Sequence, residues 1–183
     1  MHVAVYSGSF NPLHIGHLAI MQRLRDSFHW TYLIVSPKNP LKDGISADTG
    51  IDRYRAAVAA VCRHPGLRVW VDDIELGMEA PHYTIRTIDA LKAREPEHDY
   101  TLVVGADNLA DIRRWRDYGR ILAEYGIAVY PRTGFDLDGI IADLRAENPA
   151  WRIAVLDAPT VDISSTEIRE GLAEGRDMSA YLM

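Results

Sequence analysis

The chain has a single cysteine, Cys62, among its 183 residues. One cysteine excludes an internal disulfide, and its position near the end of an apolar helical stretch favours a small core residue over a reactive nucleophile. No apolar run approaches the roughly 18 residues of a membrane-spanning helix, and the N-terminus lacks the basic flank and long apolar segment of a secretory signal. These absences predict a cytoplasmic protein with no membrane partner.

An excess of positive charge is absent as well. The sequence has 20 Lys and Arg against 26 Asp and Glu, which gives a formal net charge of -6. Broad electrostatic attraction to nucleic acid is not expected from such a balance. An anionic ligand therefore needs a local basic pocket, and we expect no nucleic-acid partner.

Short apolar stretches alternate with helical patterns almost to the end of the chain. The stretches do not alternate with polar residues, as is typical of buried parallel strands, and lie at residues 3–7, 32–36, 67–71, 100–106, 127–130 and 151–156. Helical patterns lie at residues 18–26, 52–63, 84–94, 109–115, 119–124, 137–146 and 166–174. The sequence therefore predicts an α/β fold, a single domain over residues 1–183 with a doubly wound, mostly parallel, Rossmann-like sheet. Ligands are expected at the carboxyl ends of its strands.

The most informative segment, GSFNPLHIGH at residues 8–17, joins the first predicted strand to the first predicted helix. A glycine turn at that place gathers free backbone N–H groups and the positive end of a helix dipole, where anions bind well. His14 and His17 are three residues apart, so they would project from one face of a first helical turn. The three glycines of a G-x-G-x-x-G dinucleotide fingerprint are missing, and two histidines do not complete a zinc site. The segment predicts phosphate chemistry.

A second motif, DISSTEIR at residues 162–169, places three hydroxyls at a helix start. Ser164 as N-cap with Glu167 three residues later is a capping box, a common structural device. Taken alone, the segment is explained by helix capping.

The two motifs together resemble a known superfamily. The pattern G-x-F-x-P-x-H-x-G-H at residues 8–17 and I-S-S-T-x-I-R at residues 163–169 resemble the two phosphate motifs of the H-x-G-H nucleotidylyltransferases. The middle of the chain, with PKNPLK at 37–42, YTIRT at 83–87 and GADNL at 105–109 followed by Trp115, is similar to the nicotinate-nucleotide adenylyltransferase family. This resemblance spans nearly the whole chain. It implies transfer of AMP from ATP to nicotinate mononucleotide, giving nicotinate adenine dinucleotide and pyrophosphate, a step of NAD biosynthesis.

The resemblance also implies roles for individual residues. It assigns catalysis to His14, His17 and Arg169, and contacts with ATP phosphates to Gly8, Ser9, Phe10, Gly16, Lys42, Ser164, Ser165 and Thr166. It assigns ribose or nucleotide contacts to Gly105, Asp107 and Arg132, and the pyridine mononucleotide to Tyr83, Thr84 and Trp115. Mg²⁺ is expected as cofactor, held mainly by substrate phosphates and water, so no protein metal ligand is expected.

Several of these residues have a plainer alternative. Lys42 fits an ordinary solvated lysine, Thr84 and Asp107 fit helix N-caps, and Trp115 fits a packed core aromatic. The chain also departs from the family where many members carry Asp in place of Arg86 and P-P-H-K in place of N-P-L-K. Neither departure touches the two phosphate motifs, so the acceptor is less secure than the reaction class.

Other functions stay open at this point. A nicotinamide-mononucleotide adenylyltransferase is the main alternative, followed by a phosphopantetheine or cytidylyl transferase with the same histidine motif. A nucleotide-binding sensor that has kept the pocket without turnover is an alternative of another class. The sequence does not decide whether the chain forms a homo-oligomer, or whether residues 37–50 close on ligand.

Overall fold

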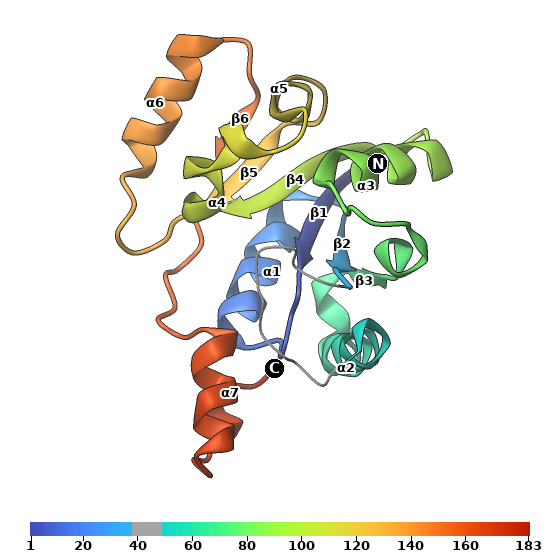
Figure 1. Cartoon of the computed structure of the whole chain (residues 1–183), viewed down its shortest axis with the longest axis vertical. Helices are drawn as coiled ribbons and strands as arrows, with labels where there is room; N and C mark the ends of the chain where they lie inside the picture. Colours follow the sequence, from blue (N-terminus) through green and yellow to red (C-terminus); the bar gives the residue numbers. More distant parts are fainter. Residues whose placement is uncertain (38–48) are drawn as a thin grey trace.

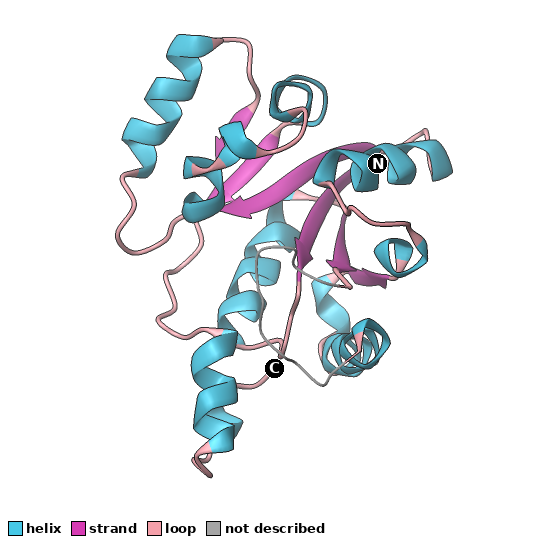
Figure 2. Cartoon of the chain, viewed as in Figure 1, coloured by secondary structure: helices cyan, strands magenta, loops and turns pink. Residues whose placement is uncertain are grey.

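A six-stranded sheet forms the centre of the molecule in the computed structural model, which describes residues 1–37 and 49–183 (Figures 1 and 2). Every strand pair is parallel, and the order across the sheet is β3-β2-β1-β4-β5-β6. The strands are β1 (His2–Gly8), β2 (Trp30–Val35), β3 (Val69–Asp72), β4 (Asp99–Gly105), β5 (Ile127–Tyr130) and β6 (Ile153–Val155). The chain builds one half of the sheet outward from β1 and then crosses back to build the other half from β4. The strand order therefore reverses between β1 and β4, and ligands are expected at the carboxyl ends of these two strands.

Helices cover both faces of this sheet. One face packs against α1 (Ile15–Ser27) and α2 (Gly50–Cys62), and the other against α3 (Thr84–Arg94), α4 (Ala106–Ala110) and α6 (Leu137–Glu147). Two further helices are α5 (Tyr118–Arg120) and α7 (Ser165–Ala173). Short turns of other helix types are η1 (Pro65–Leu67), η2 (Ile74–Gly77), η3 (Ile112–Arg114), η4 (Ile121–Tyr125) and η5 (Ser179–Tyr181).

Alternate residues of the central strand β1 enter two separate cores. Ala4 and Tyr6 belong to the core beneath α1 and α2, whereas Val3 and Val5 belong to the core on the opposite face. Because successive side chains of a strand point to opposite faces, a strand buried on both sides must be apolar throughout. This explains why the apolar stretches do not alternate with polar residues, and it confirms the predicted doubly wound α/β fold.

Three predictions of detail are wrong. Cys62 is exposed instead of packed in the core, because it is the last residue of α2 and the buried side of that helix is formed by Ala57, Ala60 and Val61. The single helix expected at 109–115 is instead α4 followed by the 3-10 turn η3. The helix expected at 119–124 begins as α5 and continues as the π-turn η4.

The carboxyl end of the chain returns to the start of α1 (Figure 1). Leu182 forms an antiparallel bridge with His14, and the backbone N–H of Met183 donates to the Leu13 carbonyl at 3.4 Å. Arg63 of α2 donates a hydrogen bond to the Met183 carbonyl. The last residues therefore pack against the turn that precedes α1 and stabilise it.

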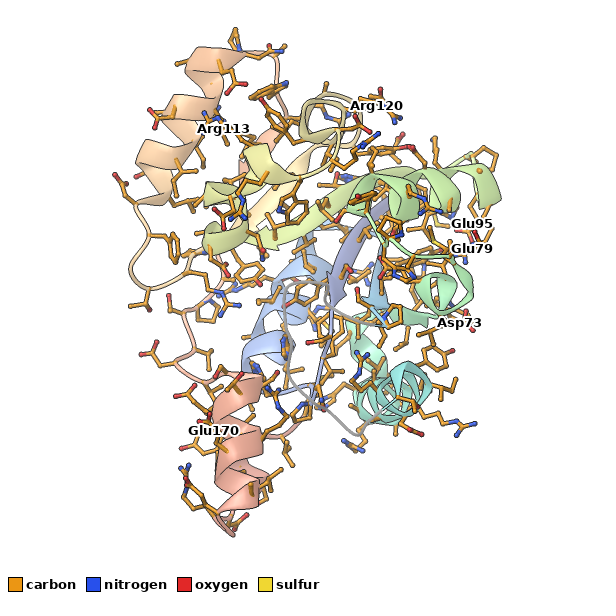
Figure 3. The ribbon with its side chains drawn as sticks, viewed as in Figure 1. Asp73, Glu79, Glu95, Arg113, Arg120 and Glu170 are labelled. Atoms are coloured by element: carbon orange, nitrogen blue, oxygen red, sulfur yellow. The ribbon has the colours of Figure 1, made fainter. Side chains whose placement is uncertain are left out.

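Many charged side chains lie on the outside of the molecule, although Arg53, Asp72 and Glu75 are buried. Figure 3 shows Glu170 on α7, Arg113 and Arg120 between β4 and β5, and Glu95 at the end of α3. Among the helices of residues 1–37 and 49–183, none is long and apolar enough to cross a membrane.

Candidate active site

The two histidines of the first motif hold the start of α1 between them. His14 is the N-cap residue, and its Nδ1 accepts a hydrogen bond from the backbone N–H of Gly16 at 3.1 Å. His17 is the third helical residue, and its Nδ1 accepts from the backbone N–H of His14 at 3.2 Å. This is a reciprocal capping box in which imidazoles replace the usual hydroxyl and carboxylate. The two ring centroids are 3.8 Å apart as a result.

These hydrogen bonds fix the tautomer of both rings. A backbone N–H can only donate, so each Nδ1 must be the unprotonated acceptor. In a neutral imidazole the proton is then on Nε2, and the described residues offer neither Nε2 a hydrogen-bond partner. His14 and His17 therefore present two N–H donors side by side.

Both imidazoles are held neutral. Burial is the main cause that lowers the pKa of His14 to about 4, and the positive charge of Arg132 lowers it further while Glu167 opposes the shift. Burial also holds the pKa of His17 well below its ordinary value, with smaller contributions from His14 and Arg132. Rings that stay neutral near pH 7 donate to an anion from Nε2–H while carrying no positive charge.

Gly16 allows this arrangement. A Cβ at position 16 would lie 2.9 Å from Cε1 and 3.0 Å from Nδ1 of the His14 ring. The His14 ring therefore packs directly over the backbone of the first helical turn, where any other residue would push it away. The glycine in the motif is explained by this contact.

The second motif is attached to the first by two hydrogen bonds. The Ser165 hydroxyl donates to the Pro12 carbonyl at 3.0 Å, and Nη1 of Arg169 donates to the Asn11 carbonyl at 2.7 Å. Nη2 of Arg169 also donates to the Thr166 hydroxyl at 3.1 Å, which holds the guanidinium along the first turn of α7. Segments more than 150 residues apart in sequence thus form one surface.

Ser164 caps α7 as the sequence predicts. Its hydroxyl accepts from the backbone N–H of Glu167 at 3.2 Å, and the Glu167 carboxylate accepts from the backbone N–H of Ser164 at 2.8 Å. Two helix starts, those of α1 and α7, therefore meet at one place, and each contributes backbone N–H groups and the positive end of a dipole.

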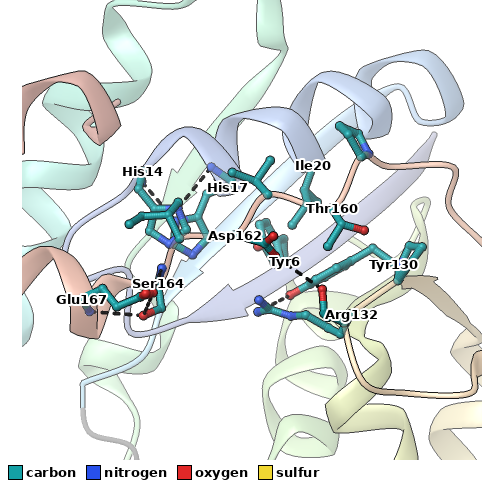
Figure 4. Close-up of a pocket in the computed structure, with 16 residues that line it drawn as sticks. Tyr6, His14, His17, Ile20, Tyr130, Arg132, Thr160, Asp162, Ser164 and Glu167 are labelled. Carbon is teal, nitrogen blue, oxygen red and sulfur yellow. Dashed lines mark hydrogen bonds between the residues drawn. The ribbon is translucent and has the colours of Figure 1, made fainter.

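Two adjoining cavities open beside these helix starts. One has a volume of about 310 Å³ and the other of about 570 Å³. His14, His17, Arg132 and Ser164 line both of them, as Figure 4 shows for the smaller cavity. The predicted residues Gly8, Ser9, Phe10, Asp107, Ser165, Thr166 and Arg169 line the larger cavity, and Gly16 lines the smaller.

Asp107 brings an unused acceptor to the larger cavity. Its Oδ1 is buried and has no hydrogen-bond partner within the described part of the chain, while Nε of Arg132 lies 3.6 Å from it. A Cβ at Gly105 would lie 2.3 Å from this oxygen, so the glycine provides the space that the carboxylate occupies. Because a buried acceptor without a partner is costly, the oxygen is well suited to a hydroxyl of a ligand.

The residues predicted to bind the pyridine ring do not line either cavity. Tyr83 is exposed at the N-cap of α3, and the Arg116 guanidinium lies 5.9 Å from the centre of its ring. Thr84 is the first residue of α3 and not its N-cap, and Trp115 is half-buried against the core of the α3 face. Lys42 lies outside the described residues.

Three residues that line the cavities were missed in the sequence. Tyr6 lies in β1 and Tyr130 ends β5, and their ring centroids are 6.2 Å apart. The guanidinium of Arg132 lies 5.3 Å from the centre of the Tyr130 ring. Arg53 of α2 is buried, and its guanidinium donates to the carbonyls of Ser9 and Ser36 at 2.7 Å. Their signal was weak, because a tyrosine in an apolar strand and a lone arginine in a helix are ordinary.

Acidic side chains do not gather at the site. Across residues 1–37 and 49–183, no group of three or more His, Cys, Asp or Glu side chains is placed to hold a metal ion. A divalent cation that enters this site would depend on oxygen ligands brought by the substrate.

Comparison with known proteins relates the whole chain to one group. The family described as Cytidylyltransferase-like matches residues 5–171. A relative from Bacteroides fragilis named probable nicotinate-nucleotide adenylyltransferase is 38% identical over 180 residues, which cover 97% of this chain and 85% of the relative. A relative of the same name from Porphyromonas gingivalis is 35% identical, covering 100% of this chain and 89% of the relative.

A solved structure shares the fold. Plasmodium falciparum nicotinic acid mononucleotide adenylyltransferase complexed with NaAD matches with a TM-score of 0.79 at 17% identity, covering 99% of this chain and 90% of that one. The match shows that the two chains share their fold over nearly their whole length.

Proposed function

Because the chain belongs to the nicotinate-nucleotide adenylyltransferases of the cytidylyltransferase-like family, we propose that it transfers AMP from ATP to nicotinate mononucleotide. The products are nicotinate adenine dinucleotide and pyrophosphate, so the reaction is a step of NAD biosynthesis. The observation that carries the proposal is the pair of neutral Nε2–H donors of His14 and His17 beside the start of α7.

The reaction is a direct displacement at phosphorus. An oxygen of the acceptor phosphate attacks the α-phosphorus of ATP, and the bond from that phosphorus to the bridging oxygen breaks as pyrophosphate leaves. No side-chain nucleophile is needed, so catalysis consists of alignment and of stabilising negative charge in the transition state.

The donor phosphates fit the surface between the two helix starts. We assign the α-phosphate to the Nε2–H groups of His14 and His17, with His17 nearest the bridging oxygen. Arg169 and the first turn of α7, including Ser165 and Thr166, would hold the leaving pyrophosphate, because the guanidinium is fixed there by Asn11. Backbone N–H groups of Gly8, Ser9 and Phe10 would complete the cradle. Gly16, whose own N–H donates to His14, would contribute the space beside the His14 ring. Lys42 stays a prediction from the sequence.

The nucleotide sugar fits the unused acceptor at the end of β4. The Oδ1 of Asp107 would accept a hydrogen bond from a ribose hydroxyl, and Gly105 leaves the space for this contact. Arg132, held near Asp107 and Tyr130, adds positive charge that favours a phosphate or a polar base edge nearby.

The acceptor ring would bind beside the start of α3. The first backbone N–H groups of a helix have no partner within the helix, so the one at Thr84 suits a pyridine carboxylate, whereas the N–H of Tyr83 already donates to the Pro81 carbonyl at 3.0 Å. The Tyr83 and Trp115 rings would stack on the pyridine. Arg116 over Tyr83 supports a negatively charged acceptor, which favours nicotinate over nicotinamide mononucleotide.

Magnesium would enter with ATP. It would be held mainly by the substrate phosphates and by water, and it would supply positive charge that stabilises the leaving group. A cytoplasmic location stays a prediction, and whether the chain forms a homo-oligomer stays open.

The test compares two acceptors on the purified enzyme. We expect pyrophosphate release with ATP, Mg²⁺ and nicotinate mononucleotide, at a kcat/KM about tenfold or more above that with nicotinamide mononucleotide. Chromatography of the dinucleotide identifies the product, and the His17→Ala variant controls for contaminating activity. A preference for the amide would move the assignment to nicotinamide mononucleotide, and no product with either acceptor would favour the sensor.

A further inference from the structure

A buried carboxylate lies between the phosphate turn and the helix proposed to bind the acceptor. Glu75 is in η2, which follows β3, and its side chain is 3% exposed. Its Oε2 accepts a hydrogen bond from the Ser36 hydroxyl at 2.6 Å, and its Oε1 accepts from the Thr87 hydroxyl at 2.7 Å. Both oxygens are therefore engaged by hydroxyls from opposite sides.

The Ser36 side leads to the phosphate turn. Ser36 follows β2, and its hydroxyl is 3.2 Å from the hydroxyl of Ser7 in β1. Because Ser36 gives its only hydroxyl proton to the carboxylate, Ser7 must be the donor in that contact. Ser7 lines the larger cavity and directly precedes Gly8 of the phosphate turn. The Ser36 carbonyl in turn accepts from buried Arg53, which lines the same cavity.

The Thr87 side leads to the start of α3. Thr87 is 1% exposed and lies in the first turn of that helix, where its backbone N–H donates to the Tyr83 carbonyl at 3.3 Å. A shift of Thr87 would therefore move Tyr83 and Thr84 with it. The hydrogen bonds form one continuous series from Ser7 through Ser36 and Glu75 to Thr87.

We propose that Glu75 is a positioning residue that sets the acceptor-binding start of α3 at a fixed distance from the phosphate turn. This inference rests on the proposed function, because it concerns how the mononucleotide is aligned with the α-phosphorus of ATP. In-line displacement needs the attacking oxygen within a few tenths of an ångström of its place, and a shift of about 1 Å costs roughly a hundredfold in rate. A carboxylate held by two hydroxyls in a dry environment is a stiff link, because its polar atoms have no water as an alternative partner.

A second buried carboxylate of the same segment provides a matched control. Asp72, at the end of β3, forms a bidentate pair with Arg94 at 2.6 and 3.2 Å. Arg94 is the last residue of α3, so this pair holds the same helix at the end away from Tyr83. Loss of either link should lower stability, but only the Glu75 link should affect the acceptor.

The experiment measures KM for both substrates and the Kd of nicotinate mononucleotide by calorimetry. Thr87→Val removes one hydroxyl at nearly constant shape, and Thr87→Ser keeps it. We expect Thr87→Val to raise the KM and Kd of the mononucleotide about fivefold or more, with the KM of ATP within about twofold. Glu75→Gln should change the same constants in the same direction, and Thr87→Ser should restore values near those of the wild type.

Asp72→Asn should lower Tm and leave the mononucleotide KM within about twofold of the wild type. Equal effects of Thr87→Val on both substrates, no effect on the mononucleotide, or the same change in Asp72→Asn would overturn the positioning role alone. A wild type that neither binds nor converts nicotinate mononucleotide would overturn the proposed function as well.

Discussion

The backbone N–H of His14 donates to Nδ1 of His17 at 3.2 Å, so the backbone of one candidate catalytic residue orients the ring of the other. Helix capping and catalysis therefore depend on the same two imidazole rings. In the cap each Nδ1 accepts a backbone hydrogen bond, so each Nε2–H stays available to a ligand. A substitution at either position consequently changes both stability and activity, and the two effects have to be separated by choice of variant.

His17→Gln separates them. Glutamine is a good third residue of a capping box, so it can still accept from the His14 backbone N–H. Its amide does not reproduce the Nε2–H at the far side of the ring. We expect Tm close to the wild type and kcat lower by about a hundredfold or more, because the lost contact strengthens in the transition state. His17→Ala should lose a similar factor in kcat and about 1 kcal/mol of stability besides.

Steady-state kinetics and thermal unfolding of both variants provide the measurement. A His17→Gln enzyme with unchanged kcat would show that position 17 serves only the helix.

The low pKa of His14 predicts how stability depends on pH. Burial and Arg132 place this pKa at about 4 in the folded chain, against about 6.5 for an unfolded one. Between these values the unfolded state binds more protons, so the free energy of unfolding rises with pH and is lost as pH falls through this window. From pH 7 to pH 5 the contribution of His14 falls by about 2 kcal/mol.

Urea unfolding at pH 7 and pH 5 tests this against His14→Asn, which keeps a good N-cap but does not titrate in this range. The wild type should lose more stability than the variant over the interval. Equal losses would mean that His14 titrates normally in the folded chain.

The sequence predicted the sheet and the helix cap of the second motif well because both are local. A strand buried on two faces can be predicted from its own apolar residues, without knowledge of its neighbours. In β1, for example, Val3 and Ala4 enter different cores. The capping box of Ser164 and Glu167 likewise lies within four consecutive residues. The matches confirm the predicted fold and the family resemblance, and the phosphate-binding role of the two motifs stays a prediction.

Other parts depend on how distant segments meet, and local patterns do not contain that information. Tyr6 reads as a strand residue, and it lines the cavities only because α7 and the end of β5 close over the carboxyl end of β1. The role of Glu75 requires three segments to converge on one carboxylate. Asp117, just before α5, takes a left-handed conformation with φ of 52° and interrupts the helical segment there. A helical sequence pattern does not predict such a break.

Gly16→Ala tests the packing of the His14 ring. The new Cβ would lie 2.9 Å from Cε1 of that ring, closer than two carbons can approach, so the ring must move and its hydrogen bond from the residue 16 backbone must lengthen. Alanine is the better helix former, so an exposed site would gain about 1 kcal/mol from this change. Here we expect a loss of stability and a fall in kcat of about tenfold or more.

Gly66→Ala is the control, since a Cβ there meets nothing within 4 Å. If Gly16→Ala were as active and as stable as this control, the close packing of His14 would not matter.

Arg169→Lys tests the assignment of the leaving pyrophosphate to α7. The guanidinium uses Nη1 for the Asn11 carbonyl and Nη2 for the Thr166 hydroxyl, and a single ammonium group cannot occupy both places at once. The charge is kept, but its position relative to the phosphates is not. We expect the KM of ATP to rise about tenfold or more and kcat to fall, while the KM of the mononucleotide stays within about threefold.

Arg176→Lys provides the comparison for this change. Arg176 lies beyond α7 and pairs with Glu174 at 2.9 Å on the surface, so its replacement should leave both KM values unchanged. Initial-rate measurements at varied ATP and fixed mononucleotide, and the reverse, separate the two constants. A rise confined to the mononucleotide KM in Arg169→Lys would instead place the guanidinium on the acceptor phosphate. Only the substrate that contacts Arg169 should be sensitive to the position of its charge, which the hydrogen bonds to Asn11 and Thr166 fix.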